Sequence, residues 1–269
     1  MTEELRLLGV FAHPDDETLG IGGLLAKYAH EGVDAYIITA TLGQRGWPAD
    51  PADNPGPDEL GRIRRDELDA ATSILNLKEV TVLDYMDGEL DSVDQHQIIQ
   101  VIAAHIMRIR PQVVITFDPF GVYGHPDHIA ISQFTTAAIV EAAAPDGIES
   151  SEYAPHKVSK LYYLAETDRN LEIHEDAFGD LVMHIDGVER RPNGWPEWAI
   201  TTQIDTSDYY GQVWQAVYCH RSQLPSFQAL LDLPDGRCEQ FFSRVNLYRA
   251  FSLVNGGRDI ETDIFAGLR

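Results

Sequence analysis

Hydrophobic residues follow two different spacings along the first two thirds of the chain. Four nearly continuous apolar runs predict buried strands: 5–12, 35–41, 80–84 and 112–117. Between them, apolar residues recur every three or four positions and predict helices: a first one ending near Ala29, then 59–75, 93–109 and 128–144. This alternation is typical of right-handed βαβ units, and it predicts a mostly parallel sheet with helices on its faces.

The last third of the chain has a less regular pattern. Three apolar runs predict strands that either extend the sheet or form a small β-cap: 160–166, 181–185 and 199–204. The segment 205–223 predicts a helix with Asp205 or Thr206 as its N-cap. We therefore predict one α/β domain over residues 1–269. A Rossmann-like, doubly wound sheet flanked by helices would fill a core at 1–165, and a small β/α extension would fill 166–269.

Composition narrows the classes of partner. The net charge of −23 argues against nucleic acid or an anionic membrane surface, since both attract positively charged proteins. The N-terminus lacks the features of a signal peptide and no apolar run is long enough to span a bilayer, so we expect a cytoplasmic protein. Cys219 and Cys238 lack the spacing of a zinc knot or a disulfide framework, and we expect both to be reduced.

Titratable residues gather in two short segments, His-Pro-Asp-Asp-Glu at 13–17 and His-Pro-Asp-His at 125–128. Each segment directly follows a predicted strand and begins the next helix. Ligands of open α/β folds bind at the carboxyl ends of the strands, so the two turns can face one crevice although they are far apart in sequence. We interpret them as two halves of one metal site.

The residue types indicate which metal and which ligands. Four side chains at the first and fourth positions of the two turns are candidate ligands: His13, Asp16, His125 and His128. Three neighbouring acids would support the metal or act beside it: Asp15, Glu17 and Asp127. A donor set of imidazole and carboxylate without thiolate suits zinc or another divalent first-row metal. Acids at 15–17 are also common as helix caps, but capping alone does not explain two matching His-Pro-Asp turns.

The sequence Ala-His-Pro-Asp-Asp-Glu at 12–17, with His-Pro-Asp-His at 125–128, resembles the PIG-L/LmbE family of metal-dependent de-N-acetylases. Members of this family remove acetyl groups from N-acetylglucosamine in glycolipids, thiol sugars or chitooligosaccharides. Features from Val10 to Gln223 follow the family order. The resemblance implies a zinc-dependent amidohydrolase that cleaves a linear amide C–N bond in a small amino-sugar substrate.

The resemblance also implies roles for individual residues. Three of them would bind zinc: His13, Asp16 and His128. Asp15 would be the general base that takes a proton from the attacking water. His125, as a cation, would stabilise the oxyanion or protonate the leaving amine, and Asp127 would hold His125 in that state. Tyr123 would contact the tetrahedral intermediate.

Substrate contacts are implied at three further motifs. Arg64 begins the family's R-x-x-E-L pattern, whose arginine contacts substrate in several relatives, although a solvated helix arginine is the alternative. Trp47 follows a T-x-G-x-x-G loop and would either stack on a sugar or pack the loop, while His220 begins an H-x-S-Q element. Trp195 and Trp198 either wall a sugar site or pack against the protein.

Two other functions remain open at this stage. One is an amidase acting on a thiol-sugar conjugate or another amide, and the other is a catalytically silent sugar-binding protein of the same fold. A complete set of base and ligands argues against the silent protein, since binding alone does not need a base. A dinucleotide site is excluded, because residues 19–23 do not give G-x-G-x-x-G and acids precede them. The sequence leaves open whether the chain forms a homo-oligomer.

Overall fold

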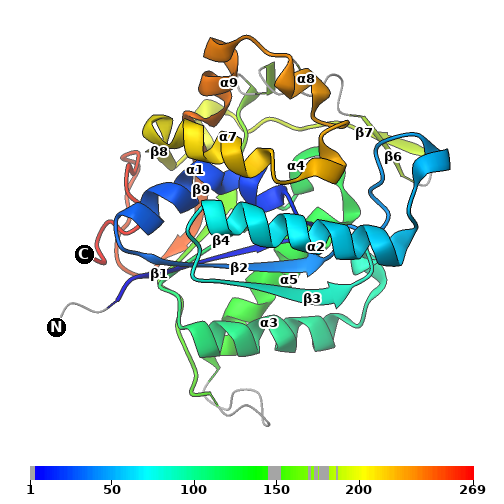
Figure 1. Ribbon diagram of the computed structural model, residues 1–269. Helices are drawn as coiled ribbons and strands as arrows, with labels where there is room; N and C mark the ends of the chain where they lie inside the picture. The colour runs from blue at the N-terminus through cyan, green and yellow to red at the C-terminus, as the bar shows by residue number, and fades with distance from the viewer. Residues whose placement is uncertain (1–3, 145–152, 169–170, 173–174, 176–181, 186) are drawn as a thin grey trace.

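A seven-stranded sheet forms the centre of the computed structural model, which describes residues 4–144, 153–168, 171–172, 175, 182–185 and 187–269 (Figure 1). The strands lie in the order β3-β2-β1-β4-β5-β9-β8. Their bounds are β1 Arg6–Phe11, β2 Asp34–Thr41, β3 Glu79–Tyr85, β4 Val113–Phe117, β5 Lys160–Leu164, β8 Thr202–Asp205 and β9 Arg244–Ser252. Neighbours among β1 to β5 pair in parallel, whereas β9 runs antiparallel to β5 and β8. The predicted Rossmann-like, mostly parallel sheet is confirmed.

Helices cover both faces of this sheet (Figure 1). On one face lie α1 (Asp16–His30), α2 (Pro57–Ile74) and α7 (Tyr210–Val217), and on the other lie α3 (Gln95–Ile109) and α5 (Pro126–Ala143). The strands between these layers are apolar on both sides, so that all five residues of β4 are buried. Burial on both faces explains why the strands appear in the sequence as continuous apolar runs rather than alternating ones.

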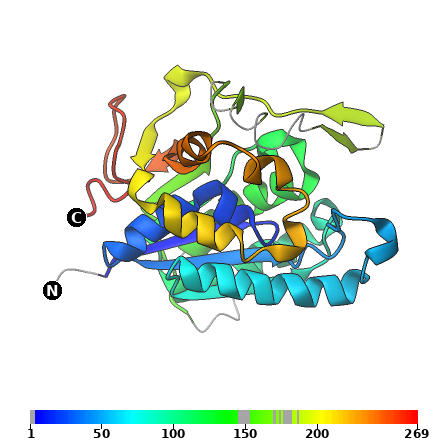
Figure 2. The ribbon, with the colours of Figure 1, turned by 45° about the horizontal axis from the view of Figure 1, so that its top comes forward.

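The shorter elements lie mostly in the C-terminal part. The short helices are α4 (Gly121–Gly124), α8 (Gln228–Leu231) and α9 (Asp235–Phe242). Strands β6 (Met183–Ile185) and β7 (Val188–Arg190) pair antiparallel as a separate two-stranded sheet, which lies away from the main sheet (Figure 2). The predicted strand at 181–185 is therefore found over 183–185, and residue 181 lies outside the described residues. The predicted strand at 199–204 became β8, which extends the main sheet.

One prediction for the last third of the chain is wrong, and one strand of that part was not predicted. The segment 205–223 is not one helix: Asp205 ends β8, and the α-helical part is confined to α7. The Asp205 carboxylate accepts hydrogen bonds from both the backbone N–H and the hydroxyl of Ser207, which favours a turn at this point. Strand β9 was not predicted at all, although it joins β5 to β8.

Chain topology brings the two His-Pro-Asp turns together. Strands β1 and β4 are direct neighbours, and their carboxyl ends lie at the same edge of the sheet. The turn after β1 is sharp, because Asp15 has a φ of 102° in the left-handed region that non-glycine residues rarely adopt. Cys219 and Cys238 are not joined by a disulfide, and none of the helices in the described ranges is long and apolar enough to cross a membrane.

Candidate active site and metal centre

A cavity of about 480 Å³ opens at the carboxyl edge of β1 and β4. Both His-Pro-Asp turns line this cavity, which we call the catalytic cavity. Arg64 and Asp87 line it from α2 and from the segment after β3, and Gln223 lines it from the C-terminal part of the chain. Of the ten site residues predicted from the sequence, seven line the cavity: His13, Asp15, Asp16, Arg64, Tyr123, His125 and His128.

The three predicted metal ligands lie at the mutual distances expected around one ion. Nδ1 of His13 is 3.2 Å from Nε2 of His128, and the Asp16 carboxylate reaches both rings with different oxygens, Oδ2 at 3.6 Å from His13 Nδ1 and Oδ1 at 3.5 Å from His128 Nε2. Ligand atoms bonded to zinc at about 2.0–2.1 Å in a tetrahedron lie about 3.3 Å apart. The positions of His13, Asp16 and His128 therefore fit a zinc-sized cation.

Two other triplets also bring their ligand atoms within 4.8 Å of one another: His13, His125, His128 and His13, Asp87, Asp127. The second triplet uses Nε2 of His13, the nitrogen on the other side of the ring, and its Asp127 carboxylate already accepts the backbone N–H groups of Gly88 and Leu90. A carboxylate so occupied is better suited to orienting a ligand than to being one.

Asp127 has a different partner from the one expected. Its carboxylate lies 3.2 Å from Nε2 of His13, and only its backbone N–H contacts His125. The prediction that Asp127 holds His125 as a cation is thus corrected: the carboxylate instead fixes the ring of His13 so that Nδ1 faces Asp16 and His128. A carboxylate on the far nitrogen of a ligand histidine sets its tautomer and strengthens it as a donor.

Asp87 was not identified from the sequence. Its carboxylate lies 3.1 Å from Nε2 of His13 and also accepts the backbone N–H of Arg45. Two carboxylates, those of Asp87 and Asp127, therefore support the same ring. The position of Asp87 in the sequence was a usable signal. Asp87 closely follows β3, a strand of the same parallel sheet, and so lies at the edge where the two His-Pro-Asp turns lie.

The titration of the candidate ligands favours cation binding. Burial lowers the pKa of His128 to about 3, so its ring is neutral and able to act as a ligand. Burial alone would raise the pKa of Asp16, but the nearby His128 ring and the hydrogen bonds with His13 outweigh it and lower the pKa to about 2. Asp16 is therefore a carboxylate at neutral pH.

The site carries excess negative charge. Four carboxylates surround the histidine rings, those of Asp15, Asp16, Asp87 and Asp127, and Arg64 contributes one positive charge. Burial lowers the pKa of His13, yet the hydrogen bonds with the carboxylates around it prevail and hold it well above the ordinary value. A divalent cation would balance this charge in the way a proton on His13 does.

Asp15 lies beside the ligand set and is held by Arg64. Nη2 of Arg64 donates to Oδ2 of Asp15 at 3.2 Å and to the carbonyl of Pro14 at 2.5 Å, while Nη1 donates to the carbonyl of Gly43 at 3.0 Å. Burial raises the pKa of Asp15 to about 6 against the opposing effect of Arg64. Asp15 is thus ionised at neutral pH but more basic than an ordinary aspartate, which suits a general base.

The glycines of the T-x-G-x-x-G loop make room for this arginine. A Cβ on Gly43 would lie 2.1 Å from Nη1 of Arg64, and Gly43 has a φ of +63°. A Cβ on Gly46 would lie 2.7 Å from the same atom. The loop therefore needs glycine because the guanidinium passes directly against its backbone.

His125 has a defined tautomer. The backbone N–H of Asp127 donates to Nδ1 of His125 at 3.2 Å, so Nδ1 carries a lone pair and a neutral ring bears its proton on Nε2. Burial lowers the pKa of His125, which favours a neutral ring in the free protein, and a cationic role for His125 during the reaction stays a prediction. Tyr123, whose pKa burial raises, stays a neutral phenol beside it, with ring centroids 6.0 Å apart.

Two of the predicted substrate contacts do not line the cavity. The indole N–H of Trp47 donates to the carbonyl of Asp50, so Trp47 packs within its own loop. His220 is only 1% exposed, and its Nε2 lies 3.3 Å from Glu17 and 3.2 Å from the hydroxyl of Thr18, where it supports the first turn of α1. For Trp47 the packing alternative is therefore the one observed, and the substrate contact predicted for His220 is corrected. From the H-x-S-Q element it is Gln223 that reaches the cavity.

The two tryptophans after residue 190 also lie outside the catalytic cavity. Trp195 donates its indole N–H to Asp118 at 2.7 Å and stacks on Tyr248, with ring centroids 4.9 Å apart. Its packing role is therefore the one observed. Trp198 is 86% exposed.

Comparison with protein families gives one clear match. The model of the PIG-L family, described as GlcNAc-PI de-N-acetylase, matches residues 8–139. This range contains both His-Pro-Asp turns and Arg64.

Two curated relatives cover the chain almost completely. The 1D-myo-inositol 2-acetamido-2-deoxy-alpha-D-glucopyranoside deacetylase of Tsukamurella paurometabola is 33% identical over 98% of this chain and 99% of its own length. The mycothiol S-conjugate amidase of Streptomyces coelicolor is 29% identical over 100% of this chain and 99% of its own. Among solved structures, the N,N'-diacetylchitobiose deacetylase of Pyrococcus horikoshii superimposes with a TM-score of 0.65 at 18% identity, covering 91% of this chain and 83% of that one.

Proposed function

Because the chain belongs to the PIG-L family of de-N-acetylases, we propose that it is a zinc-dependent deacetylase that hydrolyses the acetamide of an N-acetylglucosaminyl-inositol. Curated relatives that match it over nearly its whole length are deacetylases and amidases, and the chain is an amidohydrolase. The observation that carries the proposal is the cluster in which His13, Asp16 and His128 offer ligand atoms 3.2–3.6 Å apart, with Asp15 next to it.

Nδ1 of His13, the carboxylate of Asp16 and Nε2 of His128 would hold the zinc ion. When bound, zinc supplies a Lewis acid that makes water more acidic and polarises the amide carbonyl. Asp127 and Asp87 keep His13 in the orientation that this requires, through contacts of 3.2 and 3.1 Å with Nε2.

The remaining side chains handle the protons. Asp15, fixed by Arg64, accepts a proton from the water whose oxygen bonds to the acetamide carbon. It then passes this proton to the amide nitrogen as the C–N bond breaks, which yields acetate and a free amine. His125 is neutral with its proton on Nε2, so it acts as a hydrogen-bond donor to the carbonyl oxygen as that oxygen gains negative charge. Tyr123 offers a second donor from the same wall of the cavity.

Inositol-linked N-acetylglucosamine is the proposed substrate because the relatives with the higher identities act on it by name. The amidase from Streptomyces coelicolor, at 29% identity over the whole chain, supports cleavage of a mycothiol S-conjugate as the second candidate. Both reactions hydrolyse an amide bond, so the same catalytic residues would serve either substrate.

A substrate panel tests the proposal. The zinc-loaded protein is assayed for free amine on N-acetylglucosaminyl-inositol, a mycothiol S-conjugate, N,N'-diacetylchitobiose and N-acetylglucosamine. We expect the highest kcat/KM for the inositol conjugate, with one acetate released per amine. A higher kcat/KM for the S-conjugate would identify an amidase instead. Absence of amine release from all four would refute the deacetylase.

A further inference from the structure

A second cavity, of about 290 Å³, adjoins the catalytic cavity. The two share four lining residues: Leu19, Gly20, Glu166 and Phe241. The rest of this second cavity is formed by the C-terminal part of the chain, chiefly β8, β9 and the end of α9. None of the residues to which we assign a catalytic or metal-binding role lines it.

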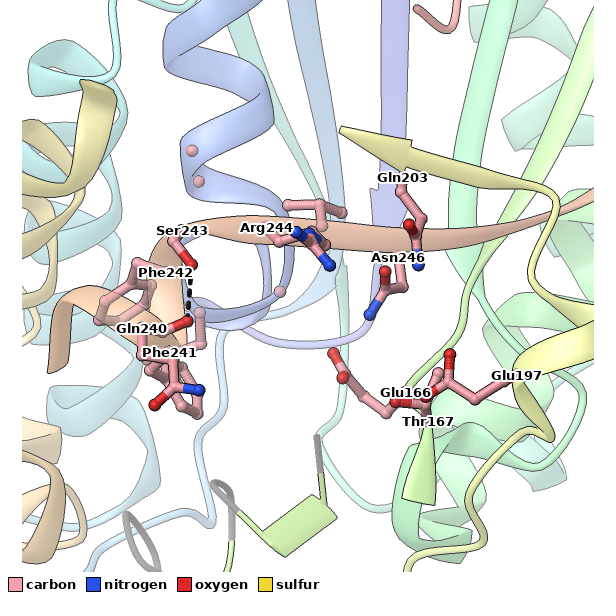
Figure 3. A pocket seen from close by; sticks show the side chains of 15 residues that line it. Glu166, Thr167, Glu197, Gln203, Gln240, Phe241, Phe242, Ser243, Arg244 and Asn246 are labelled. Atoms are coloured by element: carbon pink, nitrogen blue, oxygen red, sulfur yellow. Dashed lines mark hydrogen bonds between the residues drawn. The ribbon is translucent and has the colours of Figure 1, made fainter. Parts of the chain in front are cut away.

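Polar side chains face this space from two sides (Figure 3). Gln203, Arg244 and Asn246 extend from β8 and β9, while Glu166 and Glu197 lie opposite them. Strand geometry explains the first group. Gln203 and Asn246 are register partners in the antiparallel pair of β8 and β9, and Arg244 lies two residues before Asn246, so the three share one face of the sheet.

Asn246 is the residue that most clearly indicates a ligand. It is only 3% exposed, and within the described part of the chain its Oδ1 has no hydrogen-bond partner. A buried carboxamide oxygen without a hydrogen-bond partner costs folding free energy. In native proteins a ligand or an ordered water usually donates a hydrogen bond to such an oxygen. Asn246 lines the cavity, where a bound ligand can donate a hydrogen bond to its Oδ1.

The chemistry of the walls selects the class of ligand. Two carboxylates accept hydrogen bonds, the three carboxamides of Gln203, Gln240 and Asn246 both donate and accept, and one guanidinium donates. The net charge of the titratable lining groups is negative, which disfavours a phosphate. Phe241 and Leu19 at the junction offer apolar surface to the C–H face of a ring. Neutral polyols, whose hydroxyls donate and accept at once, match this combination.

The size and position limit the ligand further. A volume of about 290 Å³ lies at the lower end of the range for ligand pockets, about 300–1,000 Å³, and suits one six-membered ring rather than two. An amino sugar bound with its acetamide at His13 and Asp15 occupies the catalytic cavity. The group attached to that sugar must then extend past one of the cavity walls. The wall at Leu19 and Phe241 leads into the second cavity.

We propose that the cavity between β8, β9 and Glu166 is a second subsite, which binds the uncharged polyhydroxylated ring attached to the amino sugar. This subsite rests on the proposed deacetylase function for its connection to the reaction. Asn246 and Gln203 bind ring hydroxyls from the sheet, and Glu166 and Glu197 accept hydrogen bonds from ring hydroxyls on the opposite side. The subsite distinguishes a conjugate from free N-acetylglucosamine without touching the reacting bond.

Three variants test the subsite, Asn246→Leu, Gln203→Leu and Arg244→Gln, with Gln97→Leu on the exposed surface of α3 as the matched control. The readout is the ratio of kcat/KM for N-acetylglucosaminyl-inositol to kcat/KM for N-acetylglucosamine. We expect this ratio to fall about tenfold in Asn246→Leu and Gln203→Leu, the effect of one or two lost hydrogen bonds, and to stay constant in the control. Arg244 is exposed and lines the same cavity, so its variant, in which this ratio should also fall, keeps the test valid if Asn246→Leu does not fold. An unchanged ratio in all folded variants would overturn the subsite.

A binding measurement separates this proposal from the deacetylase proposal. Saturation-transfer NMR with myo-inositol alone is recorded on the wild type and on the same variants. Signal on the wild type that weakens in Asn246→Leu and Gln203→Leu supports the subsite even if no substrate is deacetylated. No signal on the wild type, or equal signal on wild type and variants, rejects the subsite even if the enzyme deacetylates the conjugate.

Discussion

The carboxylate of Asp127 lies 3.2 Å from Nε2 of His13, a residue 114 positions earlier in the chain. This contact ties the turn after β4 to the turn after β1. The other nitrogen of the same ring points to Asp16 and His128, so the orientation of one candidate ligand depends on an acid from the opposite turn.

Replacing Asp127 with Asn should weaken metal binding without abolishing it. Asn keeps an oxygen for the N–H groups of Gly88 or Leu90 but loses the charge that faces His13. Loss of such a supporting carboxylate typically costs 10- to 100-fold in metal affinity. Competition with a chelator measures the Kd, and Asp91→Asn, an exposed acid nearby, is the control. An unchanged Kd would show that the contact with His13 has no influence on the metal.

The two histidines of the second turn should differ in their effects. His128→Ala removes a ligand and should give protein without zinc after dialysis. His125→Ala removes a donor to the developing oxyanion, so it should keep the metal and lose about 10²–10³ in kcat. Metal analysis and acetate release on both variants check this. Metal loss in His125→Ala with retention in His128→Ala would exchange the two roles.

Gly43→Ala should lower kcat by displacing the guanidinium of Arg64. The new Cβ would lie 2.1 Å from Nη1 of Arg64 at a backbone φ of +63°, so the guanidinium must move and Asp15 loses its anchor. We expect a fall in kcat of at least tenfold with little change in metal content. Gly211→Ala in α7 is the matched control, since a Cβ there meets no atom within 4 Å and should leave kcat unchanged. Equal kcat in both variants would contradict a role for Arg64 in holding Asp15.

Glu261→Gln should destabilise the protein strongly. Lys160, fully buried, donates to Glu261 at 2.8 Å, and Tyr162, Thr202 and Arg249 also contact this carboxylate. The neutral variant leaves the Lys160 charge buried without its partner, which typically costs about 3–5 kcal/mol in free energy of unfolding. Urea unfolding at pH 7 measures the loss, and Glu59→Gln in an exposed ion pair should change stability by less than about 1 kcal/mol.

The same residue predicts a pH dependence. Burial alone would raise the pKa of Glu261, but the hydrogen bonds from Lys160 and Asn255 outweigh burial and lower it to about 2 from an ordinary 4.5. A lowered folded-state pKa stabilises the fold above pH 4.5, and this contribution is lost as the pH falls from 4.5 toward 2. The wild type should therefore lose more stability than Glu261→Gln over that range. An equal loss of stability in both proteins over this pH range would argue against a lowered pKa for Glu261.

Local patterns in the sequence were sufficient for the first five strands of the sheet. Most residues of β1, β2, β4 and β5 are buried, and this burial leaves an apolar run that can be recognised without knowing the partner strands, whereas the edge strand β3 is only half-buried. Local sequence patterns could not predict strand β9. It places the polar Asn246 between the buried Val245 and Leu247 and pairs with β8, about forty residues earlier, so its identity as a strand depends on non-local pairing.

For the candidate site, the motifs predicted most of the residues that line the catalytic cavity but not the contacts between them. His13, Asp16 and His128 lie close together because their turns follow the neighbouring parallel strands β1 and β4. The partner of Asp127 depended on the direction of a side chain in the first turn of α5, which spacing does not determine. His220 was misassigned for a related reason: a polar residue in a motif can serve the buried framework, here through Glu17 and Thr18, while its neighbour Gln223 reaches the cavity.

The central claim is that the two neighbouring aspartates of the first turn have different tasks, Asp16 on the metal and Asp15 on the water. Zinc content and acetate release, measured together on Asp15→Asn and Asp16→Asn, test it most directly. We predict that Asp15→Asn keeps about one zinc per chain while kcat falls at least 10²-fold, and that Asp16→Asn loses the metal. Near-normal turnover in Asp15→Asn, or undiminished zinc in Asp16→Asn, would contradict the account.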